Sequence, residues 1–184
     1  MTAPLSAADL LEGLASGLRY KYVFFWSETP RHDGSVDASC LSQWYHSPFA
    51  VDGVQYLTAE HWMMAGKARL FGDRESEEKA IAAGHPGQAK AIGRTVQGFD
   101  TATWQQHRFD LVVEGNVHKF GQNQPLLDYL LGTGDRVLVE ASPVDRIWGI
   151  GLAAQDERAQ HPAQWCGLNL LGFALMQARL RLLR

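Results

Sequence analysis

Apolar residues recur along this chain at helical spacing in several stretches, and short runs of β-forming residues separate them. The leucines that follow Ser6 at spacings of three and four predict a short amphipathic helix near the N-terminus. Further helices are predicted by the same spacing over 58–67, 104–120, 124–131 and 169–184. Between the segments 58–67 and 104–120, a helical region is interrupted at Gly72, 84–87 and Gly98. Strands are expected where apolar or alternating residues meet turn formers, at 20–26, 49–51, 54–57 and 136–140.

Together these elements predict a helix-rich α+β fold with a few short strands. The length of 184 residues is enough for one domain with a substantial core, and 46% hydrophobic and 20% charged residues are typical of a globular protein. We therefore expect an N-terminal helical extension over 1–18, followed by one domain over 19–184.

The most informative segment runs from Ser47 to Lys67. Asp52-Gly53 is a turn signal between two short apolar runs. Thr58 is a good N-cap for a helix, and Glu60 then falls in the first turn, where a carboxylate suits the exposed N–H groups. The segment therefore predicts a turn, a short apolar run and the start of a helix with an acid at its N-terminal end.

Glu60 and Lys67 lie on nearly one face of this predicted helix. Seven residues at about 100° each place them about 20° apart around the axis and about 10 Å apart along it. That spacing is too long for a helix ion pair, so the two groups could hold the two ends of a ligand. Charges on a helix are usually solvated surface. The apolar run Trp62–Ala65 leaves little polar face here, which favours a paired charge or a cleft.

A second group of residues follows the strand predicted at 136–140. Asp145 and Trp148 would lie on a loop held by that strand. Gly149 and Gly151 carry no side chains, which lets a ligand or another backbone approach closely, and Trp148 could stack on a heterocyclic base. A tight turn packed by a core tryptophan would explain the same residues, and the segment lacks the glycine spacing of a nucleotide-binding fingerprint.

The charge balance limits the classes of partner. A net charge of −3 and a pI near 6.1 predict no broad basic surface for nucleic acid or anionic membrane, although a local pocket for one phosphate remains allowed. Cys40, Cys166 and the seven histidines show no metal-ligand or disulfide spacing, so we expect no metal. No signal peptide or membrane-length apolar run is present, which predicts a cytoplasmic protein without a membrane partner.

Taken together, these motifs resemble those of the YbiA-like N-glycosidases, the NADAR family. The resemblance extends over residues 22–183 and rests on several segments in the same order. They are S-P-F-x-x-x-G at 47–53, T-x-E-H with a lysine at 58–67, Trp104, D-x-x-W-G at 145–149 and N-L-L-G at 169–172. Each motif alone is weak, whereas the ordered set is specific.

The resemblance implies hydrolysis of an N-glycosidic bond between a ribose and a nitrogen heterocycle. Breaking that bond builds positive charge on the anomeric carbon, which a carboxylate stabilises while it positions or deprotonates the attacking water. Glu60 and Asp145 are the two candidates. Lys67 could contact a phosphate, or it could attack the anomeric carbon as an amine if its pKa is lowered.

The predicted substrate-binding residues are Trp104, Trp148, Gly149, Arg94, Gln43 and Asn169. Either tryptophan could stack on the base or exclude solvent, and either could belong to the core. Gln43 stands where family members commonly carry the asparagine of Ser-Asn-Phe, and its longer side chain would change what is bound if that position contacts substrate. Arg94 could contact a phosphate or be a solvated helix charge.

We therefore predict an N-glycosidase that needs no metal or cofactor. Its substrate would be a phosphorylated or ADP-ribosylated ribosyl-heterocycle, either a riboflavin-synthesis intermediate or ADP-ribosylated guanine, including a modified base in nucleic acid. The alternative is a non-catalytic module that binds ADP-ribose or NAD, although two carboxylates would repel a pyrophosphate. The sequence does not determine the oligomeric state or the role of residues 1–18.

Overall fold

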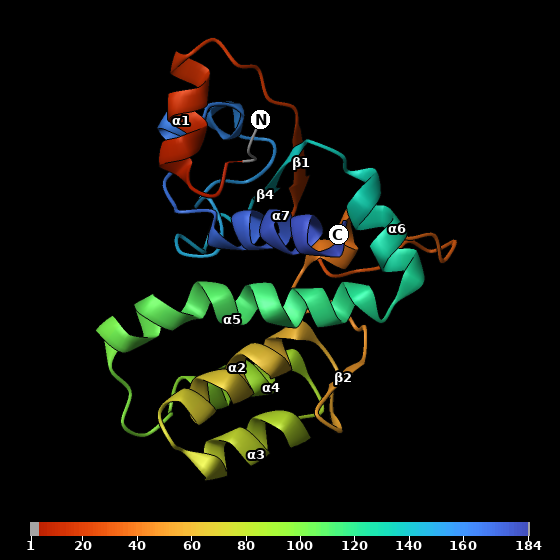
Figure 1. Ribbon diagram of the computed structural model, residues 1–184, viewed down its shortest axis with the longest axis vertical. Helices are drawn as coiled ribbons and strands as arrows, with labels where there is room; N and C mark the ends of the chain where they lie inside the picture. Colours follow the sequence, from red (N-terminus) through yellow and green to blue (C-terminus); the bar gives the residue numbers. More distant parts are fainter. Residues whose placement is uncertain (1–3, 184) are drawn as a thin grey trace. The chain divides into compact units, whose positions relative to one another are not determined.

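The computed structural model describes residues 4–183, which divide into two compact units (Figure 1). One unit combines the chain up to Ser42 with the chain from Pro125 onward, and the other is Gln43–Gln124. Residues 1–3 of the predicted extension and residue 184 of the predicted closing helix lie outside the described residues. Within the described chain, seven α-helices and two short two-stranded sheets confirm the helix-rich α+β class.

The first unit is built on a pair of parallel strands, β1 (Tyr22–Phe25) and β4 (Val137–Glu140). Helix α7 (Leu170–Leu182) packs against β4, whose first three residues are fully buried (Figure 1). The rest of the unit contains α1 (Ala7–Ala15), most of α6 (Gln124–Gly132) and three 3₁₀ turns at Ala38–Leu41, Glu157–Gln160 and Pro162–Gln164. The strand expected at 20–26 is shorter in the structure, since β1 covers only Tyr22–Phe25. Trp26 lies beyond its end and is 51% exposed, so it is not part of the core.

In the second unit, the turn predicted at Asp52-Gly53 joins an antiparallel hairpin of β2 (Phe49–Val51) and β3 (Val54–Tyr56). Both turn residues have positive φ, as a tight hairpin with the strand twist requires. Gln122, at the end of the long helix of this unit, exchanges two hydrogen bonds with the backbone of Ala50 and so holds the hairpin in place.

Four helices make up most of the second unit: α2 (Ala59–Leu70), α3 (Arg74–Ala82), α4 (Pro86–Gly93) and α5 (Thr101–Gly121). Figure 1 shows α2, α3 and α4 clustered on one side of α5. The predicted breaks are confirmed, since Asp73, His85 and Asp100 each accept a hydrogen bond from the first turn of the following helix.

Glycines allow the helices of this unit to approach closely. A Cβ added at Gly115 of α5 would lie 2.3 Å from the Trp62 ring of α2, and one added at Gly66 would lie 2.6 Å from Leu111. Trp62 also donates a hydrogen bond from its indole nitrogen to the Leu111 carbonyl. The two helices are therefore locked in one register by a fitted ring and a hydrogen bond.

None of the helices within residues 4–183 combines the length and the apolar character that a membrane span requires.

Candidate active site

Glu60 lies in the first turn of α2 and is only 3% exposed. Thr58 caps the helix, with its hydroxyl oxygen accepting from the His61 N–H. The backbone N–H of Glu60 donates to the Gln43 carbonyl at 3.0 Å. Glu60 is thus a buried carboxylate at a helix N-terminus, and it is not part of a solvated helix surface.

Gln43 connects the first turn of α2 to α5. Its amide nitrogen donates to the Asn116 side-chain oxygen at 3.1 Å, and the Asn116 amide nitrogen donates to the Val112 carbonyl at 2.8 Å and to Gln43 at 3.4 Å. Both amides are buried. The side chain expected to contact substrate is therefore directed at a neighbouring helix, while the backbone of the same residue holds the first turn of α2.

Lys119 is a buried charge that the sequence reading missed. It lies one helical turn after Asn116 on α5 and is 0% exposed, with its ammonium 5.8 Å from the Tyr45 ring centre and 5.0 Å from the Phe120 ring centre. Aromatic faces stabilise a desolvated cation, but a buried ammonium also needs negative charge nearby. Glu60 is the only buried carboxylate among the residues described for this unit.

A signal for Lys119 did exist in the sequence. The buried positions of α5 recur at 112, 113, 116 and 120, with a spacing of three to four residues. Position 119 falls on that same face, which makes it a lysine at a position where an apolar residue is expected. The pattern could have marked Lys119 as buried, but not what surrounds it.

Lys67 lies in the last turn of α2 and is half-buried. Its ammonium donates to the Gly93 carbonyl at the end of α4 at 2.6 Å and lies 4.2 Å from the Phe99 ring centre and 5.7 Å from that of Trp104. Burial lowers the pKa of Lys67 below its usual value. The structure thus brings two predicted site residues, Lys67 and Trp104, into one cation–aromatic cluster with the partly exposed Phe99.

Arg94 is exposed at the C-cap of α4, and its side chain makes no hydrogen bond or ion pair with another described residue. This environment is that of a solvated helix charge. The predicted contact between Arg94 and a phosphate stays a prediction.

The predicted loop after β4 belongs to the first unit, and Asp145 organises it. One carboxylate oxygen accepts from the backbone N–H groups of Ile147 and Trp148, both at 2.8 Å, while the Asp145 N–H donates to the Ser142 hydroxyl. Trp148 is half-buried on this loop. The carboxylate therefore fixes the position of the tryptophan three residues along the chain.

Gly149 and Asn169 anchor the same loop. A Cβ at Gly149 would lie 2.9 Å from the Glu140 carbonyl oxygen, so this glycine admits neighbouring backbone. Asn169 is fully buried in the left-handed conformation, with φ of 54°. Its side chain accepts from the Glu140 N–H and donates to the Leu138 carbonyl, both at 2.9 Å. These contacts are typical of residues that position a loop.

Across the described residues, no group of three or more His, Cys, Asp or Glu side chains is arranged to hold a metal ion. His61 is fully buried beside Glu60 in sequence, and both of its ring nitrogens bond to protein groups, the Thr58 hydroxyl and the Ala83 carbonyl. It therefore serves the packing of α2.

Comparison with known proteins gives a consistent result. A sequence model of the NADAR domain matches residues 24–183. The chain is 42% identical over 164 residues to "N-glycosidase R617" of Acanthamoeba polyphaga mimivirus, covering 86% of this chain and 95% of that protein. It is 29% identical to "N-glycosidase YbiA" of Escherichia coli, covering 80% and 81%.

Two further comparisons extend this result. "Riboflavin biosynthesis protein VVA0006" of Vibrio vulnificus is 29% identical over 93% of this chain, which spans 41% of that protein. The solved NMR structure of the Escherichia coli protein YbiA superposes with a TM-score of 0.70 at 26% identity, covering 90% of this chain and 87% of that one. With the family match, the relatives and the shared fold in agreement, this chain belongs to the NADAR domain family.

Proposed function

We propose that this protein is an N-glycosidase that hydrolyses the ribosyl C–N bond of a phosphorylated or ADP-ribosylated nitrogen heterocycle. One observation carries the proposal: Glu60, the carboxylate of the family motif, is buried at the N-terminus of α2, where its backbone N–H donates to the Gln43 carbonyl. Burying a carboxylate is costly, and such sites are enriched in catalytic groups. The N-glycosidase names of the mimivirus and Escherichia coli relatives support the reaction class.

In the proposed reaction, the C–N bond breaks as positive charge develops on the anomeric carbon. Glu60 stabilises that charge and accepts a proton from the water that adds to the carbon. The electron pair of the broken bond leaves with the heterocycle nitrogen, which takes up a proton. Asp145, the second carboxylate of the family motifs, is proposed to assist in this reaction by stabilising charge and by holding Trp148, the proposed stacking surface for the base.

Lys67 and Trp104 are proposed to bind the substrate. The ammonium of Lys67 lies in an aromatic cluster at the end of α4, where it can offer positive charge to a phosphate. Its lowered pKa would also favour attack by the neutral amine on the anomeric carbon, with release of the base and formation of a Schiff base that water then hydrolyses. A covalent adduct trapped by borohydride would distinguish this route from direct attack by water.

The experiment that tests the proposal is release of the free base, measured by chromatography and mass. Two substrates are assayed in parallel: the phosphoribosylaminouracil intermediate of riboflavin synthesis and ADP-ribosylated guanosine. We expect Glu60→Gln to lower turnover about a hundredfold or more while the protein stays folded. Glu114→Gln is the matched control, because it makes the same change from carboxylate to carboxamide at an exposed position of α5, and it should retain activity. Asp145→Asn, assayed in the same way, tests the second carboxylate.

The substrate that is cleaved decides the physiological branch. Turnover of only the first substrate would indicate clearance of riboflavin intermediates, a branch to which the name "Riboflavin biosynthesis protein" of the Vibrio vulnificus relative points. Turnover of only the second would indicate removal of ADP-ribose from guanine. If neither is cleaved and Glu60→Gln binds ADP-ribose as tightly as the wild type, the protein is a binding module and the proposal is wrong.

A further inference from the structure

The first unit contains a cavity of about 390 Å³ that none of the site residues discussed above lines. It lies at the beginning of the two parallel strands, since Lys21 directly precedes β1 and Asp135 comes two residues before β4. The loop with Asp145 and Trp148 follows the other end of β4. The cavity and that loop are therefore separate features of the same unit.

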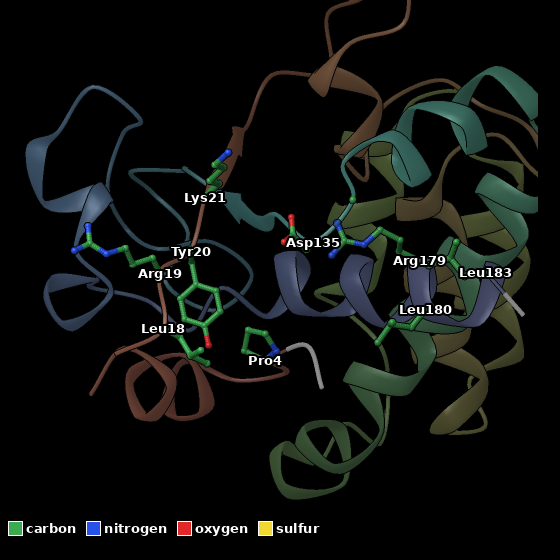
Figure 2. Close-up of a pocket in the computed structure, with 10 residues that line it drawn as sticks. Pro4, Leu18, Arg19, Tyr20, Lys21, Asp135, Arg179, Leu180 and Leu183 are labelled. Atoms are coloured by element: carbon green, nitrogen blue, oxygen red, sulfur yellow. The ribbon is translucent and has the colours of Figure 1, made fainter. Parts of the chain in front are cut away.

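Half of the cavity wall comes from the N-terminal segment. Pro4, Leu18 and Tyr20 line it from this segment, which precedes residue 24, where the match to the NADAR domain begins. Figure 2 shows Tyr20 and Arg179 on opposite sides, with Pro4 and Leu180 below them. The segment thus adds a wall to the family domain, which gives the predicted extension a role.

Arg179 of α7 supplies a buried positive charge to this cavity. It is 2% exposed, and one guanidinium nitrogen donates to the Thr133 hydroxyl at 2.6 Å and to the Arg136 carbonyl at 3.1 Å. Within residues 4–183, no carboxylate lies within 4.0 Å of the guanidinium, and its other two nitrogens donate to no protein acceptor. The Asp135 carboxylate acts on Arg179 through space, but the hydrogen-bond acceptors of the guanidinium are neutral, which favours an additional anion beside this buried cation.

The remaining surroundings define the kind of anion. Arg19 and Lys21 also line the cavity, so its lining residues include three cations and a single carboxylate, Asp135, which lies beside Arg179 in Figure 2. Such a lining draws anions toward the cavity. The walls between these charges are apolar or aromatic, as in sites for small organic molecules, and the volume lies within the range of such sites.

We propose that this cavity is a second binding site, which takes a small organic anion: an aromatic or aliphatic body with one carboxylate, phosphate or sulfonate group. The anionic group pairs with Arg179, and the body packs against Tyr20, Leu18 and Leu180. The site is independent of the proposed glycosidase activity, because no residue of the proposed reaction lines it.

The first test measures equilibrium binding of anilinonaphthalene sulfonate to the folded full chain, with fluorescence as the readout. Its uncharged analogue, N-phenylnaphthylamine, is the matched probe. We expect saturable binding of one sulfonate per chain and much weaker binding of the neutral probe. Leu18→Trp, a half-exposed position at the wall, should fill the cavity and lower the affinity about tenfold.

The charge contribution is tested at exposed positions, where folding is not at risk. The double variant Arg19→Glu with Lys21→Glu should weaken sulfonate binding about threefold to tenfold at low salt, since the reversed charges repel the anion. Arg181→Glu, an exposed charge reversal on the same helix but outside the cavity, should leave binding unchanged. Each variant is first checked for cooperative unfolding.

The proposal would be overturned by absence of saturable binding, by equal binding of both probes, by unchanged affinity in Leu18→Trp, or by an equal loss in Arg181→Glu. Loss of binding in Glu60→Gln would place the probe at the proposed active site and would also overturn it. Conversely, a protein without glycosidase activity that binds the probe as expected would leave this site intact and refute only the proposed reaction.

Discussion

His61 illustrates how a buried side chain next to a catalytic candidate can be purely structural. Its Nε2–H donates to the Ala83 carbonyl, because a carbonyl can only accept, and its Nδ1 then accepts from the Thr58 hydroxyl. The contact at Nδ1 requires the neutral ring, because a protonated Nδ1 cannot accept a hydrogen bond. Burial accordingly lowers the pKa of His61 below its usual 6.5, and nearby histidines lower it further.

This arrangement predicts a loss of stability in mild acid. Between the lowered pKa and 6.5 the unfolded chain binds a proton that the folded chain does not, so the free energy of unfolding falls as the pH falls. The slope from this residue approaches about 1.4 kcal/mol per pH unit. We expect the free energy of unfolding of His61→Phe to depend less on pH than that of the wild type. Urea titrations between about pH 7.5 and 5, roughly the range over which histidine titrates, would measure this difference.

His107, which is exposed on α5, provides the control for that experiment. His107→Phe should keep the wild-type dependence on pH. An identical slope in the wild type and in His61→Phe would show that His61 does not carry the effect.

Lys119 leads to a prediction about charge balance. We infer that the buried ammonium and the buried carboxylate of Glu60 offset one another, because Glu60 is the only buried acid, and Lys119 the only buried lysine or arginine, in the described part of the second unit. Lys119→Met keeps the volume but removes the charge, and we expect it to lower the free energy of unfolding by about 3–5 kcal/mol. The double variant with Glu60→Gln should recover part of that loss, as urea titrations would show.

Lys79→Met is the matched control, since this exposed lysine belongs to a surface ion pair with Glu75. Its effect should stay below about 1 kcal/mol. Strictly additive effects of Lys119→Met and Glu60→Gln would contradict the inferred charge balance.

At the level of elements, the packing of α2 against α5 depends on residues without side chains. Gly115→Ala would push a methyl group into the rigid Trp62 ring, where the added Cβ lies 2.3 Å away, and we expect a loss of about 1–3 kcal/mol in thermal or urea unfolding. Gly132→Ala at the end of α6 meets no atom within 4 Å and should be neutral or slightly stabilising. A neutral Gly115→Ala would mean that the two helices adjust their distance freely.

The elements also show why local predictions succeeded. The hairpin at Asp52-Gly53, the cap at Thr58 and the cap at Asp73 each involve contacts between residues at most seven positions apart. Such contacts follow from the conformations that individual residues favour. By contrast, Gln43 and Asn116 are 73 positions apart, and no local pattern indicates that their amides pair.

At the scale of the whole molecule, the division into two units cuts across the sequence order. The first unit takes its strands from both ends of the chain, so β1 pairs with β4 although more than a hundred residues separate them. The N-terminal segment, which the sequence suggested as an appendage, contributes to the wall of a cavity in this unit. Whether it is a separate domain, as the boundary at 18 and 19 implies, stays a prediction.

The sequence by itself determined the α+β class, most element positions and the family, because caps, turns and an ordered set of motifs are local and can be recognised without coordinates. Only the tertiary structure decided how deeply the candidate residues are buried and which groups they contact. It buried Glu60 and Lys119, turned Gln43 toward Asn116 and committed Asn169 to the β4 backbone. These outcomes depend on packing between segments that are distant in the sequence. That packing determines whether a side chain is buried and which groups it can bond to.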